Sequence, residues 1–248
     1  MKELIIMWLL AAMKLWSPVH REHFVPEAKE TPEQATARYQ EIADAIMTVA
    51  FDEGTKPLFP GPGGRLSTAM FVANMFWSES GFRRDVDLGT SHVRLRHEGL
   101  NDFGRSWCMG QINLGSVMVD DPQHPGAKIE TSVAKTAEGW AGPELVADRI
   151  KCIKATIRIA RSSLGECAAL PFNERLASYA RGNCNDETGR ALSTVKMVHF
   201  VRWDHHSRPH VKDAEVLKEM LDANKQAGGG VPRVPDGATS IPVQAVRD

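Results

Sequence analysis

Residues 67–82, STAMFVANMFWSESGF, contain the stretch that decides the fold of this chain. From Met70 to Trp77 the side chains are apolar on every helical face except at Asn74. This pattern predicts a buried helix of about two to three turns. Ser67 and Thr68 are typical N-cap residues and are expected to start it.

Glu79 then falls at the C-terminal end of the predicted helix. Burial and the negative end of the helix dipole both favour the protonated carboxyl group. A glutamate that keeps its proton near neutral pH can act as a general acid. The alternative is a carboxylate that turns outward into solvent, as most glutamates do.

The composition is that of an ordinary globular protein. The chain has 248 residues, of which 42% are hydrophobic and 25% charged, and a formal net charge of -1. Because a basic excess is lacking, we expect no nucleic-acid partner. The sequence contains no apolar stretch near the length of about 20 residues that a membrane-spanning helix needs, so we also expect no membrane span.

The N-terminal segment Leu4–Met13, LIIMWLLAAM, has two interpretations. Its length suits the apolar region of an export signal, but Glu3 precedes it and no small-x-small cleavage site follows before Ser17. Alternatively the segment is an amphipathic helix of the fold, because several apolar residues share one helical face: Ile5, Trp8, Leu9, Ala12 and Trp16.

The four cysteines, Cys108, Cys152, Cys167 and Cys184, lack zinc-site spacing. They could form two disulfides, with three pairings to choose from and an oxidising compartment implied, or remain four buried thiols. His206 and His210 are four residues apart, but Pro209 argues against a helix that would bring them together. We therefore expect no metal site and no cofactor.

Local signals divide the chain into four parts: an apolar segment and linker (1–30), a main domain (31–210), a C-terminal helix (211–227) and a flexible Gly/Pro-rich tail (228–248). Thr31, Pro32 and Gln34 form a capping box for a helix that should end near Gly54. Further helices are expected after Pro143, over Phe172–Tyr179 with an end at Gly182, over Val195–Trp203, and over Val211–Lys225.

The segment between Asp85 and Trp107 shows neither helical nor strand periodicity and predicts an irregular lobe, with room for a short hairpin. Met109–Leu114 could begin a short helix. Residues 120–142 are expected to be mainly loop.

Three strings occur in a fixed order: ESGF at Glu79–Phe82, MGQIN at Met109–Asn113 and ASYARG at Ala177–Gly182. In this order, with a long helix before the third, they resemble the catalytic domain of soluble lytic transglycosylases. That domain has a lysozyme-like fold related to goose-type lysozyme, and its motifs are ES with a nearby aromatic, GLMQI and AYNAG. The resemblance covers roughly Ser67–Trp203 and implies a mainly α fold with an irregular active-site lobe.

The resemblance implies a role for each matching residue. Glu79 would be the single catalytic acid/base, Ser80 would hold the substrate or Glu79, Gln111 would lie near a sugar N-acetyl group, and Tyr179 would lie near the catalytic carboxylate. Each also has a structural alternative: Ser80 could end the helix, Gln111 could bind loop backbone groups, and Tyr179 could belong to the core. The implied partner is the glycan strand of peptidoglycan, and the implied location is the cell envelope, the periplasm or the exterior.

The chain also departs from the family pattern. It has CMGQ where the family has GLMQ, and Ala180 and Arg181 follow Tyr179 where the family has an asparagine. These changes leave open a non-catalytic glycan-binding or assembly protein of the same fold.

The reaction itself has two versions. A lytic transglycosylase uses one glutamate, whereas a muramidase would need a second carboxylate to position water, for which Asp87 and Asp102 are the candidates. Trp107, in a polar loop, is the aromatic residue that we expect to stack on a sugar.

Overall fold

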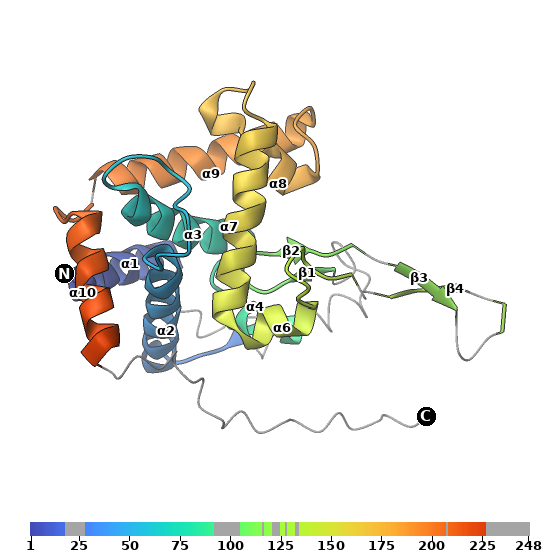
Figure 1. Cartoon of the computed structure of the whole chain (residues 1–248). Helices are drawn as coiled ribbons and strands as arrows, with labels where there is room; N and C mark the ends of the chain where they lie inside the picture. The colour runs from blue at the N-terminus through green and yellow to red at the C-terminus, as the bar shows by residue number, and fades with distance from the viewer. Residues whose placement is uncertain are drawn as a thin grey trace.

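The computed structural model describes residues 1–17, 28–91, 105–115, 117–120, 125–126, 128–131, 134–206 and 208–226. The described chain is mainly helical, as predicted, with two short antiparallel strand pairs beside the helices (Figure 1). The elements are α1 (Lys2–Trp16), α2 (Pro32–Ala50), α3 (Gly64–Ser80), α4 (Arg84–Asp87), β1 (Ser106–Trp107), β2 (Ile112–Asn113), β3 (Val117–Asp120), β4 (Lys128–Thr131), α6 (Gly142–Ala147), α7 (Arg149–Glu166), the 3-10 helix η2 (Phe172–Glu174), α8 (Ala177–Arg181), α9 (Glu187–His206) and α10 (Asp213–Gln226).

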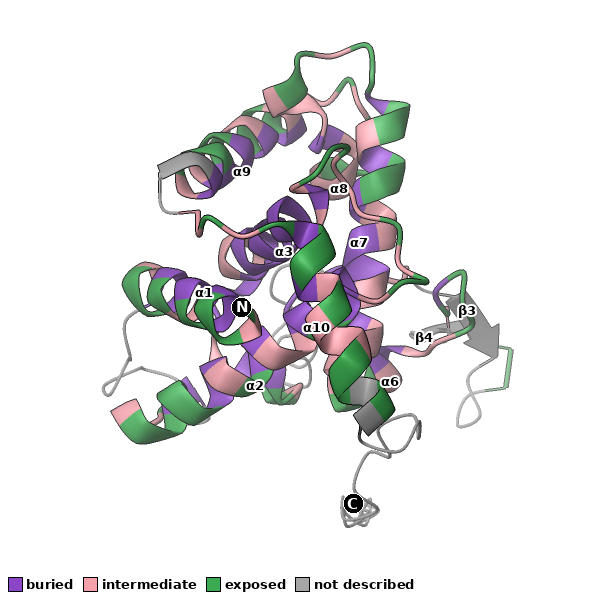
Figure 2. Cartoon of the chain, turned by 60° about the vertical axis from the view of Figure 1, so that its left-hand side comes forward, coloured by how far each residue is buried: buried purple, intermediate pink, exposed green. Residues whose placement is uncertain are grey.

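Helix α3 occupies the centre of the fold. It contacts α1, α2, α7, α9 and α10, and every residue from Leu66 to Phe76 is buried. Figure 2 shows it as an almost continuously buried rod among amphipathic neighbours. The predicted buried helix is therefore confirmed, and its burial explains why the segment lacks a polar face.

The start of α3 differs from the prediction. The helix begins at Gly64, three residues before Ser67, and its first amide groups are capped from another helix. The amides of Arg65 and Leu66 donate to the two carboxylate oxygens of Asp213, at 2.7 and 3.2 Å. Thr68 lies inside the helix, where its hydroxyl donates to the Gly64 carbonyl at 2.7 Å. Ser67 and Thr68 are thus not caps, because a carboxylate at the start of α10 performs that function.

The N-terminal helix α1 is packed into the core. Its residues Ile5, Leu9 and Ala12 are fully buried, and the helix contacts α2 and α3. This packing agrees with the interpretation of the segment as an amphipathic helix of the fold. Its other face carries exposed apolar residues, among them Leu4, Met7 and Leu15. Among the described residues, no helix combines the length and apolar character needed to cross a membrane.

The capping box at the start of α2 is confirmed. The Gln34 amide donates to the Thr31 hydroxyl at 3.2 Å, and the Thr31 amide donates to the Gln34 side chain at 2.9 Å. The helix ends at Ala50, a little before the expected Gly54, because the chain turns at Phe51.

One local prediction after Trp107 was wrong and another holds. Met109–Leu114 does not start a helix: Trp107 pairs with Ile112 across a tight turn in which Cys108 and Gln111 have φ values of 53° and 48°. Within its described residues, the segment 120–142 is mainly loop as predicted, apart from the pairing of β4 with β3. Asp102, the linker 18–27 and the tail 228–248 lie outside the described residues.

The four cysteines form two disulfides, Cys108–Cys152 and Cys167–Cys184. The first joins the β1–β2 turn to α7, and the second joins the end of α7 to the segment after α8. Of the two open alternatives, the structure therefore has disulfides and not free thiols.

The cap from Asp213 predicts a measurable loss of stability. Replacing Asp213 with Ala leaves the amides of Arg65 and Leu66 without their acceptor in a largely buried position, which should cost about 1–3 kcal/mol of the free energy of unfolding. Chemical denaturation measures this change. Glu215→Ala is the control, because Glu215 is an exposed acid in the same first turn of α10. Equal losses in the two variants would contradict the capping role.

Candidate active site

Glu79 lies where α3 ends. Gly81 closes the helix in the left-handed conformation, with φ of 60°, and its amide donates to the Trp77 carbonyl at 2.8 Å. The Glu79 carboxylate contacts the ammonium group of Lys196 on α9. The two side chains are 17% and 9% exposed, so the pair is largely withdrawn from water. The outward-turned alternative for Glu79 therefore does not describe this structure.

Lys196 is held in place through the backbone of α9. Its carbonyl accepts a hydrogen bond from the Asn74 amide at 3.0 Å, and the Asn74 carbonyl oxygen lies 2.8 Å from Nδ1 of His199. Asn74 is the one polar residue of the apolar run, and it is fully buried. Its side chain thus fixes α9 against α3 at the height that brings Lys196 to Glu79.

Tyr179 joins the three sequence strings. Its hydroxyl donates to the Gly110 carbonyl at 2.6 Å, and the ammonium of Lys196 lies 5.8 Å from the centre of its ring. Burial raises the pKa of Tyr179 well above its ordinary value, and the nearby charge of Glu79 raises it further. Glu79, Gly110 and Tyr179, far apart in sequence, therefore lie around one point.

The turn that carries Gly110 is fixed against α7. A Cβ atom on Gly110 would lie 2.2 Å from the hydroxyl of Thr156, so only glycine fits there. The disulfide from Cys108 to Cys152 holds the same turn. Gln111 donates its side-chain amide to the Cys108 carbonyl at 3.0 Å, which is the loop-backbone role that the sequence left open for it.

A groove of about 520 Å³ lies beside this point. It runs between the β1–β2 turn, α7 and α8, and its lining residues are Gln111, Ile112, Asn113, Ile159, Ser178, Tyr179, Ala180, Arg181 and Gly182. Gln111 and Tyr179, two of the four predicted substrate contacts, both line it. Glu79 does not line the groove and adjoins it through Tyr179.

Two other predicted contacts are placed differently. The Ser80 hydroxyl donates to the Phe76 carbonyl at 2.6 Å, so it bonds its own helix and not Glu79. Trp107 is only 8% exposed, and a Cβ atom on Gly142 would lie 2.0 Å from its ring. Its ring packs on Gly142, so the expected sugar-stacking surface is not available.

Asp87 is committed to a buried ion-pair group. Its carboxylate oxygens accept from Nη2 and Nε of Arg149 at 2.7 and 3.1 Å, and Nη1 of Arg38 lies 3.6 Å away. The Asp87 side chain is 2% exposed. These contacts join α4 to α2 and α7, so both oxygens that could have positioned a water are already occupied. Asp102 lies outside the described residues.

Sequence reasoning missed Lys196. The residue lies 117 positions from Glu79, and no local motif connects them. The sequence nevertheless indicated its position, because Lys196 lies on the same helical face as Met197 and Phe200, and this face is buried. A lysine at a core position of an amphipathic helix is almost always paired, and this rule could have prompted a search for its acid.

Within the described residues, no group of three or more His, Cys, Asp or Glu side chains is placed to hold a metal ion. Comparison of the chain with protein-family models, with curated proteins and with solved structures gives no match.

The environment of Tyr179 predicts that its phenol ionises only at a pH above the ordinary range for tyrosine. The chain has two tyrosines, Tyr39 and Tyr179, and burial is the main cause of a raised pKa for both. At pH 10 the native protein should show little phenolate absorbance, whereas the unfolded chain should be about half ionised. Stability should therefore fall as the pH rises through 10, because the unfolded state then releases protons that the native state retains.

Tyr179→Phe should remove about half of the phenolate signal that appears on unfolding at pH 10, and Tyr39→Phe should remove the other half. Absorbance at the phenolate band in native and denaturing buffer measures this. Full native ionisation of Tyr179 at pH 10 would contradict the packing described here.

The Glu79–Lys196 pair predicts strong coupling in a double-mutant cycle. Lys196→Met leaves a largely buried carboxylate without its cation, and Glu79→Gln leaves a buried ammonium, so each single change should cost about 1–3 kcal/mol. The double variant should be less destabilised than the sum of the two, because it leaves no unpaired charge. Additive losses in denaturant unfolding would show that the two groups do not interact.

Proposed function

We propose that this protein cleaves the glycan strand of peptidoglycan as a lytic transglycosylase on a lysozyme-like fold, with Glu79 as its acid/base. The observation that carries the proposal is the convergence of the three strings: Glu79 from the first, Gly110 and Gln111 from the second and Tyr179 from the third. Strings that resembled a family motif by chance would have no reason to meet at one partly open carboxylate beside a groove.

In this reaction Glu79 protonates the oxygen that bridges N-acetylmuramic acid and N-acetylglucosamine. The acetamido group of the substrate stabilises the positive centre, and Glu79 then removes the proton of the C6 hydroxyl as a 1,6-anhydro ring closes. Glu79 thus gives one proton to the leaving oxygen and regains another from the C6 hydroxyl, so its protonation state is restored and no water is consumed. Gln111 and Tyr179, which line the groove, position the sugar.

Lys196 sets the starting state of this chemistry. Its ammonium contacts the Glu79 carboxylate in the free protein. The acid step therefore requires that a proton pass from Lys196 to Glu79 before Glu79 donates it to the bridging oxygen. A bound glycan that excludes water favours this proton transfer. Without water the ion pair loses the solvation of its two charges, so the neutral acid and amine become more favourable by comparison.

The occupied carboxylate of Asp87 supports transglycosylation over hydrolysis. A muramidase needs a second group to position water across the sugar, and Asp87 holds two arginines instead. The two disulfides support an oxidising location such as the cell envelope or the exterior.

A second candidate function is non-catalytic glycan binding, and the Glu79–Lys196 contact is the observation that favours it. A carboxylate neutralised by a lysine makes a stable polar core for a groove that only binds. Such a protein would retain glycan without cutting it.

Digestion of purified sacculi separates these functions. The wild type should release muropeptides with 1,6-anhydro ends, and Glu79→Gln should reduce the rate by at least about 100-fold, since general acid–base groups contribute that much or more. Glu53→Gln, an exposed glutamate on the turn after α2, is the matched control and should cut normally. Chromatography and mass spectrometry identify the ends.

Reducing ends in place of anhydro ends would show hydrolysis. Sacculus binding without release by any variant would support the non-catalytic candidate. Equal release by the wild type and Glu79→Gln would reject Glu79 as the acid/base.

A further inference from the structure

The groove beside Tyr179 carries a single full charge. Of its lining residues, only Arg181 and Tyr179 are ionisable, and the raised pKa of Tyr179 keeps the phenol neutral. Arg181 is exposed, and none of the described residues forms an ion pair or hydrogen bond with it. Within the part of the chain that the structure describes, the groove therefore carries one guanidinium group without an ionic partner.

The other polar groups of the lining are neutral. Gln111, Asn113 and Ser178 supply amide and hydroxyl groups, which suit the hydroxyl and acetamido groups of a sugar. The nearest described acid bound to the lining is Glu166, which accepts from Ser178 at 2.8 Å and from Ser162 at 2.6 Å. Hydrogen bonds from these hydroxyl groups, that of Ser162 first, lower the pKa of Glu166, and Glu166 itself does not line the groove.

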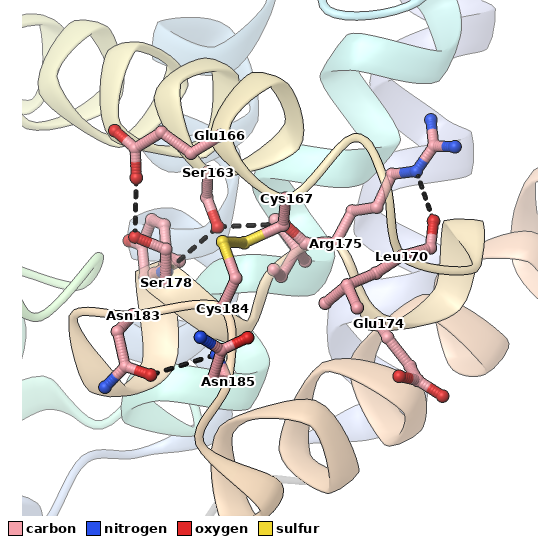
Figure 3. The surroundings of a disulfide bond; sticks show 12 residues. Ser163, Glu166, Cys167, Leu170, Glu174, Arg175, Ser178, Asn183, Cys184 and Asn185 are labelled. Atoms are coloured by element: carbon pink, nitrogen blue, oxygen red, sulfur yellow. Dashed lines mark hydrogen bonds between the residues drawn. A yellow bond between two sulfur atoms is a disulfide. The ribbon is translucent and has the colours of Figure 1, made fainter.

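The position of Arg181 is rigid at its backbone. Arg181 ends α8, and Gly182 closes the helix in the left-handed conformation with φ of 76°. Figure 3 shows how α8 is tied to α7: Ser163 accepts from the Tyr179 amide at 3.0 Å, and the Cys167–Cys184 disulfide holds the segment that follows. Arg181 thus belongs to a fixed wall of the groove, so little backbone entropy is lost on binding.

We propose that this groove selects glycans that bear carboxylates and that Arg181 binds one carboxylate through its guanidinium fork. The planar fork matches two carboxylate oxygens, whereas neutral sugars offer it no partner of equal strength. This inference rests on the proposed function and adds the part of the substrate that Arg181 recognises. In peptidoglycan that part is a carboxylate of the stem peptides, which are attached to the lactyl groups. Arg181 replaces part of the family string AYNAG, so this contact is a property of this chain.

The test is ligand titration of the isotope-labelled full chain by NMR, with three probes. The first is a disaccharide-peptide with free carboxylates, the second is the same compound with its carboxylates amidated, and the third is N-acetylglucosamine tetramer. The wild type should bind the first at least about tenfold more tightly than the other two, since hydrogen bonds to charged groups contribute that much. The amide signals of Asn113 and Gly182 should shift.

Arg181→Gln should abolish the difference between the first two probes, and Arg181→Lys should restore part of it. Arg202→Gln is the matched control, because Arg202 is an exposed arginine on α9 that does not line the groove, and it should behave as the wild type does. An unchanged preference in Arg181→Gln, or equal wild-type affinity for the free and amidated probes, would overturn the inference.

The outcomes remain separate from those of the proposed function. Failure of the wild type to bind any probe also overturns the inference, whatever the sacculus digestion shows. Conversely, a preference that depends on Arg181, in a protein that cuts no sacculi, would leave the inference standing and reject the enzyme.

Discussion

The burial of α3 on every face from Leu66 to Phe76 is the constraint on which the rest of the structure depends. A helix with no solvent face must have each polar group paired by another element, because a buried group without a partner costs about 1–3 kcal/mol. Its first amides are capped by Asp213, the Ser67 hydroxyl donates to Asp204 at 3.0 Å, and Asn74 is bound by α9. Each of these pairings also fixes where a neighbouring helix crosses α3.

The proposed active site is a consequence of the same constraint. Asn74 sets the height of α9, and this height places Lys196 against Glu79 at the point where α3 reaches the surface. The pairings that stabilise the core and the contacts that arrange the site thus share residues. A substitution in α9 that shifts its position along α3 would disturb stability and site geometry together.

The sequence predicted those features that depend on neighbours along the chain. The apolar run identified α3, the reciprocal capping box identified the start of α2, and Gly182 identified the end of α8. Such signals are local, so they can be read without knowing the fold.

The errors arose where the deciding partner is distant. The prediction of Ser67 as a cap failed because the true cap, Asp213, lies 148 positions from the Arg65 amide that it binds. The prediction that Trp107 faces a sugar failed because its packing partner Gly142 gives no local signal. Gln111 has a positive φ that a non-glycine residue rarely adopts, and the turn there is held by the cross-link of Cys108 to α7. Long-range packing thus decides both the cap and the site.

The charges around Glu79 relate the structure to the proposed chemistry. The site holds one carboxylate, one ammonium and one phenol that stays neutral, while Asp87 is paired elsewhere. In the proposed reaction the Glu79–Lys196 pair gives one proton to the leaving oxygen, and the net charge of the pair changes from zero to minus one. A second nearby carboxylate or a phenolate would raise the cost of that change by repulsion, and neither is present among the described neighbours. Recovery of the C6 proton returns the pair to zero, so a reaction in which the same groups give and regain a proton fits this set of charges.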